Sequence, residues 1–164
     1  MSPLEGVTRF RIPEDVIDTT LKVLRHAGSD GHEAFVVWGG TVDGDSVTFE
    51  AAMVPEQRPH RTPRGLLVTV DGPSLHKVNQ AMYGAGLTLA GQVHSHPTDA
   101  FHSDTDDCYP LVTLTGALSV VIPDFARNGR KAMREWAWYR LLGTGAWTEL
   151  TRADKVELLP SRHQ

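Results

Sequence analysis

Residues 94–107 read HSHPTDAFHSDTDD, and this stretch decides how the rest of the chain is interpreted. Residues 87–96 predict a strand that Pro97 brings to an end. Side chains of a strand alternate between its two faces, so His94 and His96 are expected to point to the same side. Two imidazole rings on one face can both reach a single metal ion.

A helix start follows this strand. Ser103 fits the N-cap position, and Asp106 then occupies the third helical position. The helix is predicted to run over 103–115, with a kink or an early end near Tyr109 because Pro110 lies inside it. A carboxylate in the first helical turn can face the two histidines. Two histidines and one aspartate leave the fourth tetrahedral position for water, which is the arrangement of a catalytic zinc site.

Upstream of this stretch, the chain predicts alternating strands and helices. Residues 9–12 predict a short strand, and Pro13 then opens an amphipathic helix that stops at Gly28. Apolar runs between turn signals predict strands at 35–38, 46–54 and 66–70 and a helix at 73–84. Residues 55–65 are rich in arginine and proline, and we expect a mobile surface loop there.

Downstream, residues 118–122 predict a strand, and residues 136–142 and 147–150 predict a final hairpin. Helices separate some of the predicted strands, whereas short turns join others. This pattern predicts an α/β fold, with a mixed β-sheet and helices packed on it, rather than a doubly wound parallel sheet.

The composition predicts one soluble domain over residues 1–164. Hydrophobic residues make up 40% of the chain, and the net charge of −4 argues against a nucleic-acid binder with a broad positive face. The single cysteine, Cys108, cannot form an internal disulfide. No apolar run is long enough to span a membrane, and the first residues lack the apolar region of a signal peptide. We therefore expect a cytoplasmic protein with no nucleic-acid or membrane partner.

The motif resembles that of the JAMM metalloproteases, also called JAB or MPN-plus domains. That family carries His-x-His-Pro, a loop and then Ser-x-x-Asp, which residues 94–97 and 103–106 match. The catalytic glutamate that the family places on an earlier strand maps best to Glu33. The resemblance covers about residues 9–122, and it implies the MPN, or cytidine-deaminase-like, α/β fold.

The spacing of the motif departs from the family in one respect. The family usually leaves ten residues between the second histidine and the aspartate, whereas Asp106 leaves nine and Asp107 leaves ten. If Ser103 and the helix start are fixed, Asp106 is the ligand and the loop is one residue shorter. If the total spacing is fixed, Asp107 is the ligand. We favour Asp106, because a loop loses a residue more easily than the motif loses its serine.

The resemblance also implies a role for each residue. His94, His96 and Asp106 would hold Zn²⁺, which lowers the pKa of its bound water to about 7. Glu33 would act as general acid and base, and Ser103 would donate a hydrogen bond to the oxyanion. Glu50, which also lies on a predicted strand, is the competing candidate for the general base.

The resemblance is closest to bacterial, deubiquitinase-like members linked to ubiquitin-like conjugation operons. It implies cleavage of the amide bond after the C-terminal glycine of a ubiquitin-like protein, with E1-like and E2-like enzymes of the same operon as further partners. The leaving group would be a lysine side chain or a short C-terminal extension.

Two other functions stay open at this point: a catalytically inactive MPN scaffold, and a peptidase that trims sulfur-carrier proteins. Three assignments stay open as well. His102 is either a loop histidine or a further ligand, and Cys108 is best interpreted as a small buried hydrophobe. The basic loop that contains residues 58–64 would either hold the substrate's tail or acidic surface or simply be solvated.

Overall fold

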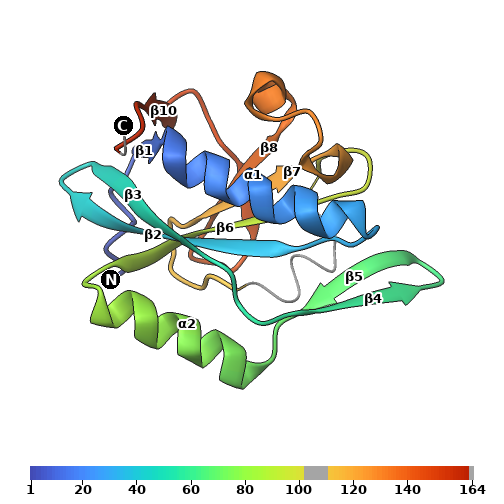
Figure 1. Ribbon diagram of the computed structural model, residues 1–164. Coiled ribbons are helices and arrows are strands. Elements are labelled where there is room, and N and C mark those ends of the chain that lie inside the picture. Colours follow the sequence, from blue (N-terminus) through green and yellow to red (C-terminus); the bar gives the residue numbers. More distant parts are fainter. Residues whose placement is uncertain (102–110, 163–164) are drawn as a thin grey trace.

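A mixed β-sheet is the centre of the computed structural model, which describes residues 1–101 and 111–162 (Figure 1). Within this part of the chain, eight strands form one sheet in the order β10-β1-β3-β2-β6-β7-β8-β9. Their bounds are β1 Arg9–Pro13, β2 Phe35–Asp43, β3 Ser46–Met53, β6 Thr88–Ser95, β7 Leu118–Ile122, β8 Ala137–Leu141, β9 Trp147–Glu149 and β10 Lys155–Leu159. Two further strands, β4 Arg58–Thr62 and β5 Gly65–Thr69, pair with each other as a separate hairpin.

The sheet contains both parallel and antiparallel pairs, as predicted. β2 runs antiparallel to β3 and to β6, whereas β6 and β7 are parallel. β1 lies between β3 and β10 and is parallel to both. The final hairpin of β8 and β9 continues the sheet antiparallel to β7.

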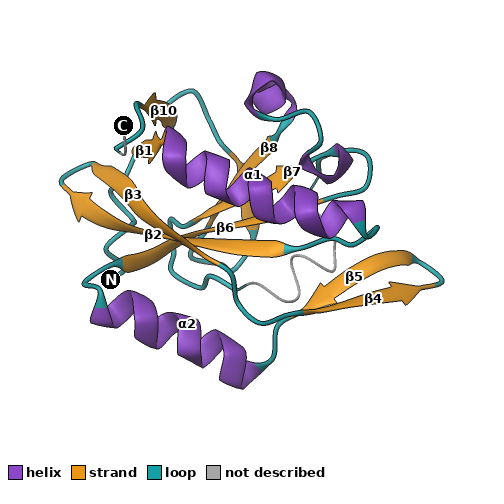
Figure 2. Ribbon diagram, viewed as in Figure 1, coloured by secondary structure: helices purple, strands orange, loops and turns teal. Residues whose placement is uncertain are grey.

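Two helices cover opposite faces of the sheet, as Figure 2 shows: α1, Glu14–Ser29, and α2, Gly72–Gly84. Alternate side chains of β2 divide between two apolar clusters. Val36 and Trp38 belong to the cluster that contains the buried face of α1, whereas Phe35 and Val37 belong to the cluster with α2. The sheet is therefore buried on both sides at β2, which explains why this strand is apolar without alternation.

Each helix has a local cause. α1 begins directly after Pro13, whose extended backbone suits the residue before a helix. On the core side of α1, the Thr20 hydroxyl accepts a 2.8 Å hydrogen bond from the Trp38 indole. Asp71 caps α2 by accepting a 2.7 Å hydrogen bond from the Ser74 N–H, and the hydrogen bonds from Ser74 lower the pKa of Asp71.

Two short 3₁₀ segments, η1 at Asp124–Ala126 and η2 at Arg130–Glu135, connect β7 to β8. Gly28 of α1 packs directly against η1. A Cβ atom at this position would lie 2.5 Å from the Cβ atom of Phe125. The helix and the turn can approach this closely only because the residue is glycine. In the described part of the chain, no helix has the length and apolar character needed to cross a membrane.

The predicted loop at 55–65 is wrong for most of its length. Residues Arg58–Thr62 form β4, which pairs antiparallel with β5 and is exposed throughout. Among the described strands β4 pairs only with β5, and an edge strand of this kind tolerates a proline such as Pro59. The hairpin turns over Pro63 and Arg64.

The helix predicted at 103–115 is wrong for residues 111–115, the part of it that the structure describes. Residues 111–115 are not helical. The N–H groups of Leu111 and Val112 donate to the side-chain oxygen of Gln92, at 2.9 and 3.1 Å, instead of to carbonyls of a preceding helical turn. Residues 103–110 of that prediction lie outside the described residues.

Candidate functional site

The two histidines of the motif lie side by side at the end of β6. The Nε2 atoms of His94 and His96 are 3.1 Å apart. Both side chains are buried, with exposed fractions of 0% and 6%. Residues two apart on a strand share a face, so the extended backbone directs both rings to the same side.

Backbone hydrogen bonds hold His96 from two directions. Its N–H donates to the Ile122 carbonyl at the end of β7 (2.9 Å), and its carbonyl accepts from the Phe125 N–H in η1 (2.8 Å). All three residues of η1 have left-handed φ angles, of 56°, 52° and 61°, although none is glycine. This backbone conformation is strained in residues other than glycine, so the turn persists only because the surrounding hydrogen bonds hold it in place. One further bond, from the N–H of the first η1 residue to the Thr98 carbonyl (3.0 Å), fixes the segment after the histidines.

A hydrogen bond within this segment sets the tautomer of His96. Its Nδ1 atom lies 3.0 Å from the carbonyl oxygen of Asp99. A carbonyl oxygen only accepts, so Nδ1 carries the proton and donates it. The lone pair of the neutral ring is then on Nε2, the atom beside His94. Metal-binding histidines are commonly oriented by a carbonyl in this way.

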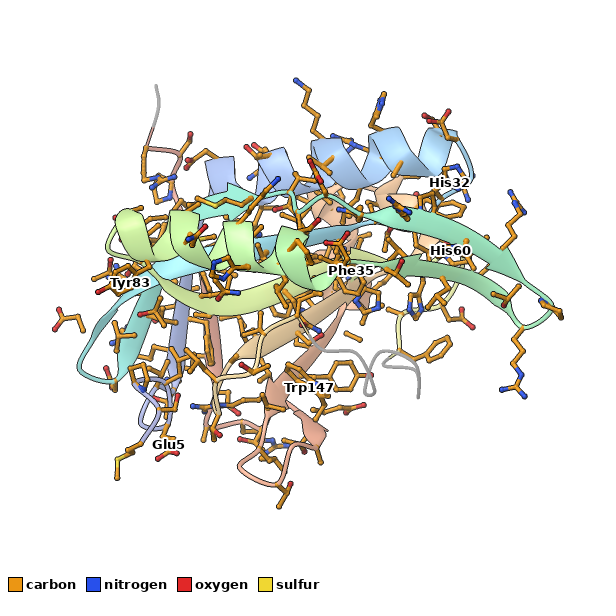
Figure 3. The ribbon with its side chains drawn as sticks, turned by 90° about the horizontal axis from the view of Figure 1, so that it is seen from below. Glu5, His32, Phe35, His60, Tyr83 and Trp147 are labelled. Carbon is orange, nitrogen blue, oxygen red and sulfur yellow. The ribbon has the colours of Figure 1, made fainter. Side chains whose placement is uncertain are left out.

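Aromatic side chains pack against both rings. The Phe35 ring centroid lies 5.0 Å from that of His94, and Phe101 meets His96 edge-on at 4.8 Å. Figure 3 labels Phe35, which lies under the sheet next to the hairpin that carries His60. These contacts limit the rotation of the two imidazole rings.

A cavity of about 510 Å³ joins His96 to Glu33. Glu33 is partly buried and lies two residues before β2. The cavity walls are formed by Glu33, Phe35, residues 64–70, His96, Pro97, Thr98, Phe101 and Leu111. We call this space the hairpin groove, because residues 64–70 belong to β5 and its flanks.

The backbone next to Glu33 is bonded to the backbone between the two histidines. The Ala34 N–H donates to the Ser95 hydroxyl (3.2 Å), and the Ser95 N–H donates to the Ala34 carbonyl (3.3 Å). This pairing holds the backbone next to Glu33 beside the backbone between the two histidines. The competing candidate, Glu50, is exposed on β3, where it accepts a hydrogen bond from Thr41, and it does not line the groove.

Two glutamines that the sequence analysis did not single out form side-chain hydrogen bonds to the backbone around the site. The Gln57 amide accepts from the Phe35 N–H (2.7 Å) and donates to the Phe35 carbonyl (2.9 Å), so it pairs with the start of β2 as a strand would. The buried Gln92 accepts from two backbone N–H groups, those of Leu111 and Val112. Neither role has a local sequence signal, although Gln92 lies two residues before His94 and shares its face.

The chain is similar to a known protein of nearly equal length. The chain is 39% identical over 159 residues to the probable metalloprotease y4jG of Sinorhizobium fredii, and the alignment covers 97% of this chain and 98% of that protein. The chain belongs to the same family as this metalloprotease. Family membership supports a metal-dependent peptidase activity in general. No model of a known protein family matches the sequence.

A solved structure shares the fold. The solution structure of protein DSY2949 from Desulfitobacterium hafniense is similar with a TM-score of 0.64, at 18% identity, over 94% of this chain and 97% of that one. At this identity the likeness is evidence for the α/β fold alone.

The spacing of the two histidines is compatible with a shared zinc ion, one of the metals that a metalloprotease can contain. Two Zn–N bonds of about 2.0–2.1 Å at a tetrahedral angle separate the nitrogens by roughly 3.3 Å. The Nε2 atoms of His94 and His96 are 3.1 Å apart, so a small adjustment of the rings accommodates one ion between them. Within residues 1–101 and 111–162, no group of three or more His, Cys, Asp or Glu side chains is arranged to hold a metal. The predicted third ligand, Asp106 or Asp107, lies outside these ranges, as do His102, Ser103 and Cys108.

Proposed function

We propose that the chain is a zinc-dependent peptidase of the JAMM type, built on the MPN fold, which cleaves the amide bond after the C-terminal glycine of a ubiquitin-like protein. The observation that carries the proposal is the pair of buried imidazoles, with Nε2 atoms 3.1 Å apart, of which His96 lines the same groove as Glu33. The family of probable metalloprotease y4jG supports the peptidase part of the proposal.

His94, His96 and Asp106, or alternatively Asp107, are the residues that would hold Zn²⁺. The bound ion supplies Lewis-acid chemistry, since it polarises a carbonyl and makes a water molecule acidic near neutral pH. The Asp99 carbonyl supports this set by keeping the proton of His96 on Nδ1.

Glu33 moves the proton in this proposal. Its carboxylate takes a proton from the attacking water and later delivers it to the leaving amine, which would otherwise depart as an unstable anion. Glu33 lines the same groove as His96, which suits both transfers, because a substrate bound in this groove would lie next to both side chains. Ser103 donates a hydrogen bond to the oxygen on which negative charge develops.

The hairpin groove suits an extended polypeptide tail. β5 pairs only with β4 among the described strands, so its other edge has backbone groups available for pairing. Every residue from 64 to 70 lines the groove, although neighbouring side chains of a strand point in opposite directions. The edge of β5 therefore borders the cavity, and a tail can add to it as a further strand. The unstructured C-terminus of a ubiquitin-like protein has the required form.

The test is cleavage of ubiquitin-like proteins fused through their C-terminal glycine to a short peptide or to a lysine side chain. The zinc-loaded protein should cleave such a fusion, and Glu33→Ala should lower kcat by about 100-fold or more while retaining the metal. Glu50→Ala, the matched control, should leave both unchanged. A protein that binds zinc but cleaves no fusion from a panel of conjugation-type and sulfur-carrier proteins would instead be an inactive scaffold.

The leaving group selects between the finer alternatives. Cleavage of lysine-linked fusions would support deconjugation, with E1-like and E2-like enzymes as partners in the same system. Release of short C-terminal extensions from sulfur-carrier proteins alone would support the trimming function.

A further inference from the structure

The β4–β5 hairpin is basic in an otherwise acidic chain. Residues 58–70 include Arg58, Arg61 and Arg64 and contain no aspartate or glutamate, whereas the whole chain has a net charge of −4. All of β4 is exposed to solvent. The positive charge is therefore displayed at the surface next to the hairpin groove.

Two of these arginines lie on the Glu33 side of the hairpin. Arg64 lines the groove together with Glu33. The Nη2 atom of Arg61 lies 3.1 Å from the position that a Cβ atom would take on Gly31, two residues before Glu33. Arg58 lines another hollow together with Glu56 and Asp71, and it does not line the groove.

Neither Arg61 nor Arg64 is neutralised within the described part of the chain. None of the ion pairs and side-chain hydrogen bonds found there includes either guanidinium group. Exposed arginines usually find a carboxylate nearby at little cost, and other arginines of this chain do so: Arg130 contacts Glu14 and Asp18 at 3.0 Å. Two guanidinium groups that have no carboxylate partner among the described residues, one lining the groove and one next to Gly31, favour an anionic ligand.

From this placement we infer that Arg61 and Arg64 form a specificity site for aspartate and glutamate side chains in the substrate's tail, close to the cleaved bond. The inference rests on the proposed function and adds a substrate class to it: a polypeptide whose C-terminal segment is acidic. The guanidinium group suits this ligand, because its planar N–H donors match a carboxylate in a bidentate arrangement. A nucleic acid fits less well, since the adjoining wall of the groove is apolar at Leu66, Leu67 and Val68.

Binding can be measured without cleavage, in zinc-loaded protein that carries Glu33→Ala. Fluorescein-labelled peptides that end in Gly-Gly would be compared by anisotropy, with aspartate, asparagine or lysine at the positions before the glycines. We expect the aspartate peptide to bind about five- to tenfold more tightly than the lysine peptide, with a difference that shrinks as salt is raised. Equal affinities for the three peptides would overturn the inference, and so would tighter binding of a single-stranded oligonucleotide than of the aspartate peptide.

A charge reversal gives the second arm of the experiment. The double variant Arg61→Glu and Arg64→Glu should invert the preference, so that the lysine peptide binds best. The double variant Arg25→Glu and Arg152→Glu is the matched control, because both arginines are exposed and neither lines the groove. If this control changes the preference as much as the hairpin variants do, only the net charge matters and the specificity site is refuted. Binding that discriminates, with no cleavage of any fusion by the unsubstituted protein, would refute the proposed function while leaving the acidic-ligand site in place.

Discussion

Gln92 connects β6 to two other segments of the chain through its side-chain amide. It is buried, shares a face of β6 with the two histidines, and accepts a hydrogen bond from the N–H of Leu111, where the second described range begins. Its amide also donates to the Ser119 hydroxyl on β7 at 3.2 Å. Asp106, the residue proposed as third ligand, is five positions before Leu111. Because Gln92 holds the backbone at Leu111 in place, it limits the positions that the Asp106 side chain can reach.

Replacing Gln92 by leucine should therefore weaken zinc binding by about tenfold, as expected for a residue that orients a ligand. The substitution should also destabilise the fold by about 1–3 kcal/mol, because it leaves the N–H groups of Leu111 and Val112 unpaired. Zinc affinity would be measured by competition with a chelator, and stability by urea unfolding. Gln80→Leu on the exposed face of α2 is the control and should change neither. If the Gln92 variant loses stability but keeps its zinc affinity, the residue is structural only.

At the scale of elements, the packing of α1 against η1 connects the helix to the histidine segment. Gly28 makes this contact possible, and η1 in turn donates to the His96 carbonyl. Exchange of a helical glycine for alanine usually stabilises a protein by about 0.5–1 kcal/mol. Here the added methyl group would lie 2.5 Å from the Cβ atom of Phe125, so the same exchange is expected to destabilise the protein.

We expect Gly28→Ala to lower the free energy of unfolding by about 1–3 kcal/mol, the usual cost of overpacking. Gly84→Ala, near the end of α2, is a matched control, because nothing lies within 4 Å of its added Cβ atom. It should be neutral or stabilising. Thermal unfolding of the two variants tests the comparison, and equal midpoints would contradict the close contact between α1 and η1.

At the scale of the whole molecule, Arg140 links segments that are far apart in the sequence. From β8 it donates to the Asp154 carboxylate (2.8 Å) and to the Leu4 carbonyl (2.9 Å), and its guanidinium lies 5.5 Å from the centre of the Phe10 ring. One side chain thus joins the N-terminal segment, β1 and the β9–β10 connection.

Arg140→Met should lower the free energy of unfolding by about 1–3 kcal/mol, since it leaves the half-buried partners without their donor. Arg152→Met, at an exposed position, should have no measurable effect. Hydrogen exchange would show whether β1 and β10 lose protection together in the Arg140 variant. Loss of protection in only one of these two strands would contradict a shared anchor.

The sequence predicts what depends on local periodicity and misses what depends on distant partners. The patterns at residues 46–54 and 118–122 place those strands correctly, because the start of the first alternates polar with buried apolar residues and the second is mostly apolar. The same reasoning wrongly predicts a loop at β4, because its five exposed residues form a strand only through pairing with β5. β10 is missed for a similar reason, since its pairing with β1 joins the two ends of the chain.

The candidate site follows the same division. The shared direction of His94 and His96 follows from strand geometry alone, and the structure brings their Nε2 atoms together. By contrast, the carbonyl of Asp99 and the amide of Gln57 act through contacts that no spacing in the sequence encodes.

The most direct test of the account is the location of zinc in crystals of the zinc-loaded protein, from anomalous scattering at the zinc absorption edge. We predict one zinc peak per chain, about 2.0–2.1 Å from the Nε2 atoms of both His94 and His96, with the Glu33 carboxylate facing the same space. A peak at another place, or protein that takes up zinc equally well after both histidines are replaced by alanine, would contradict the account.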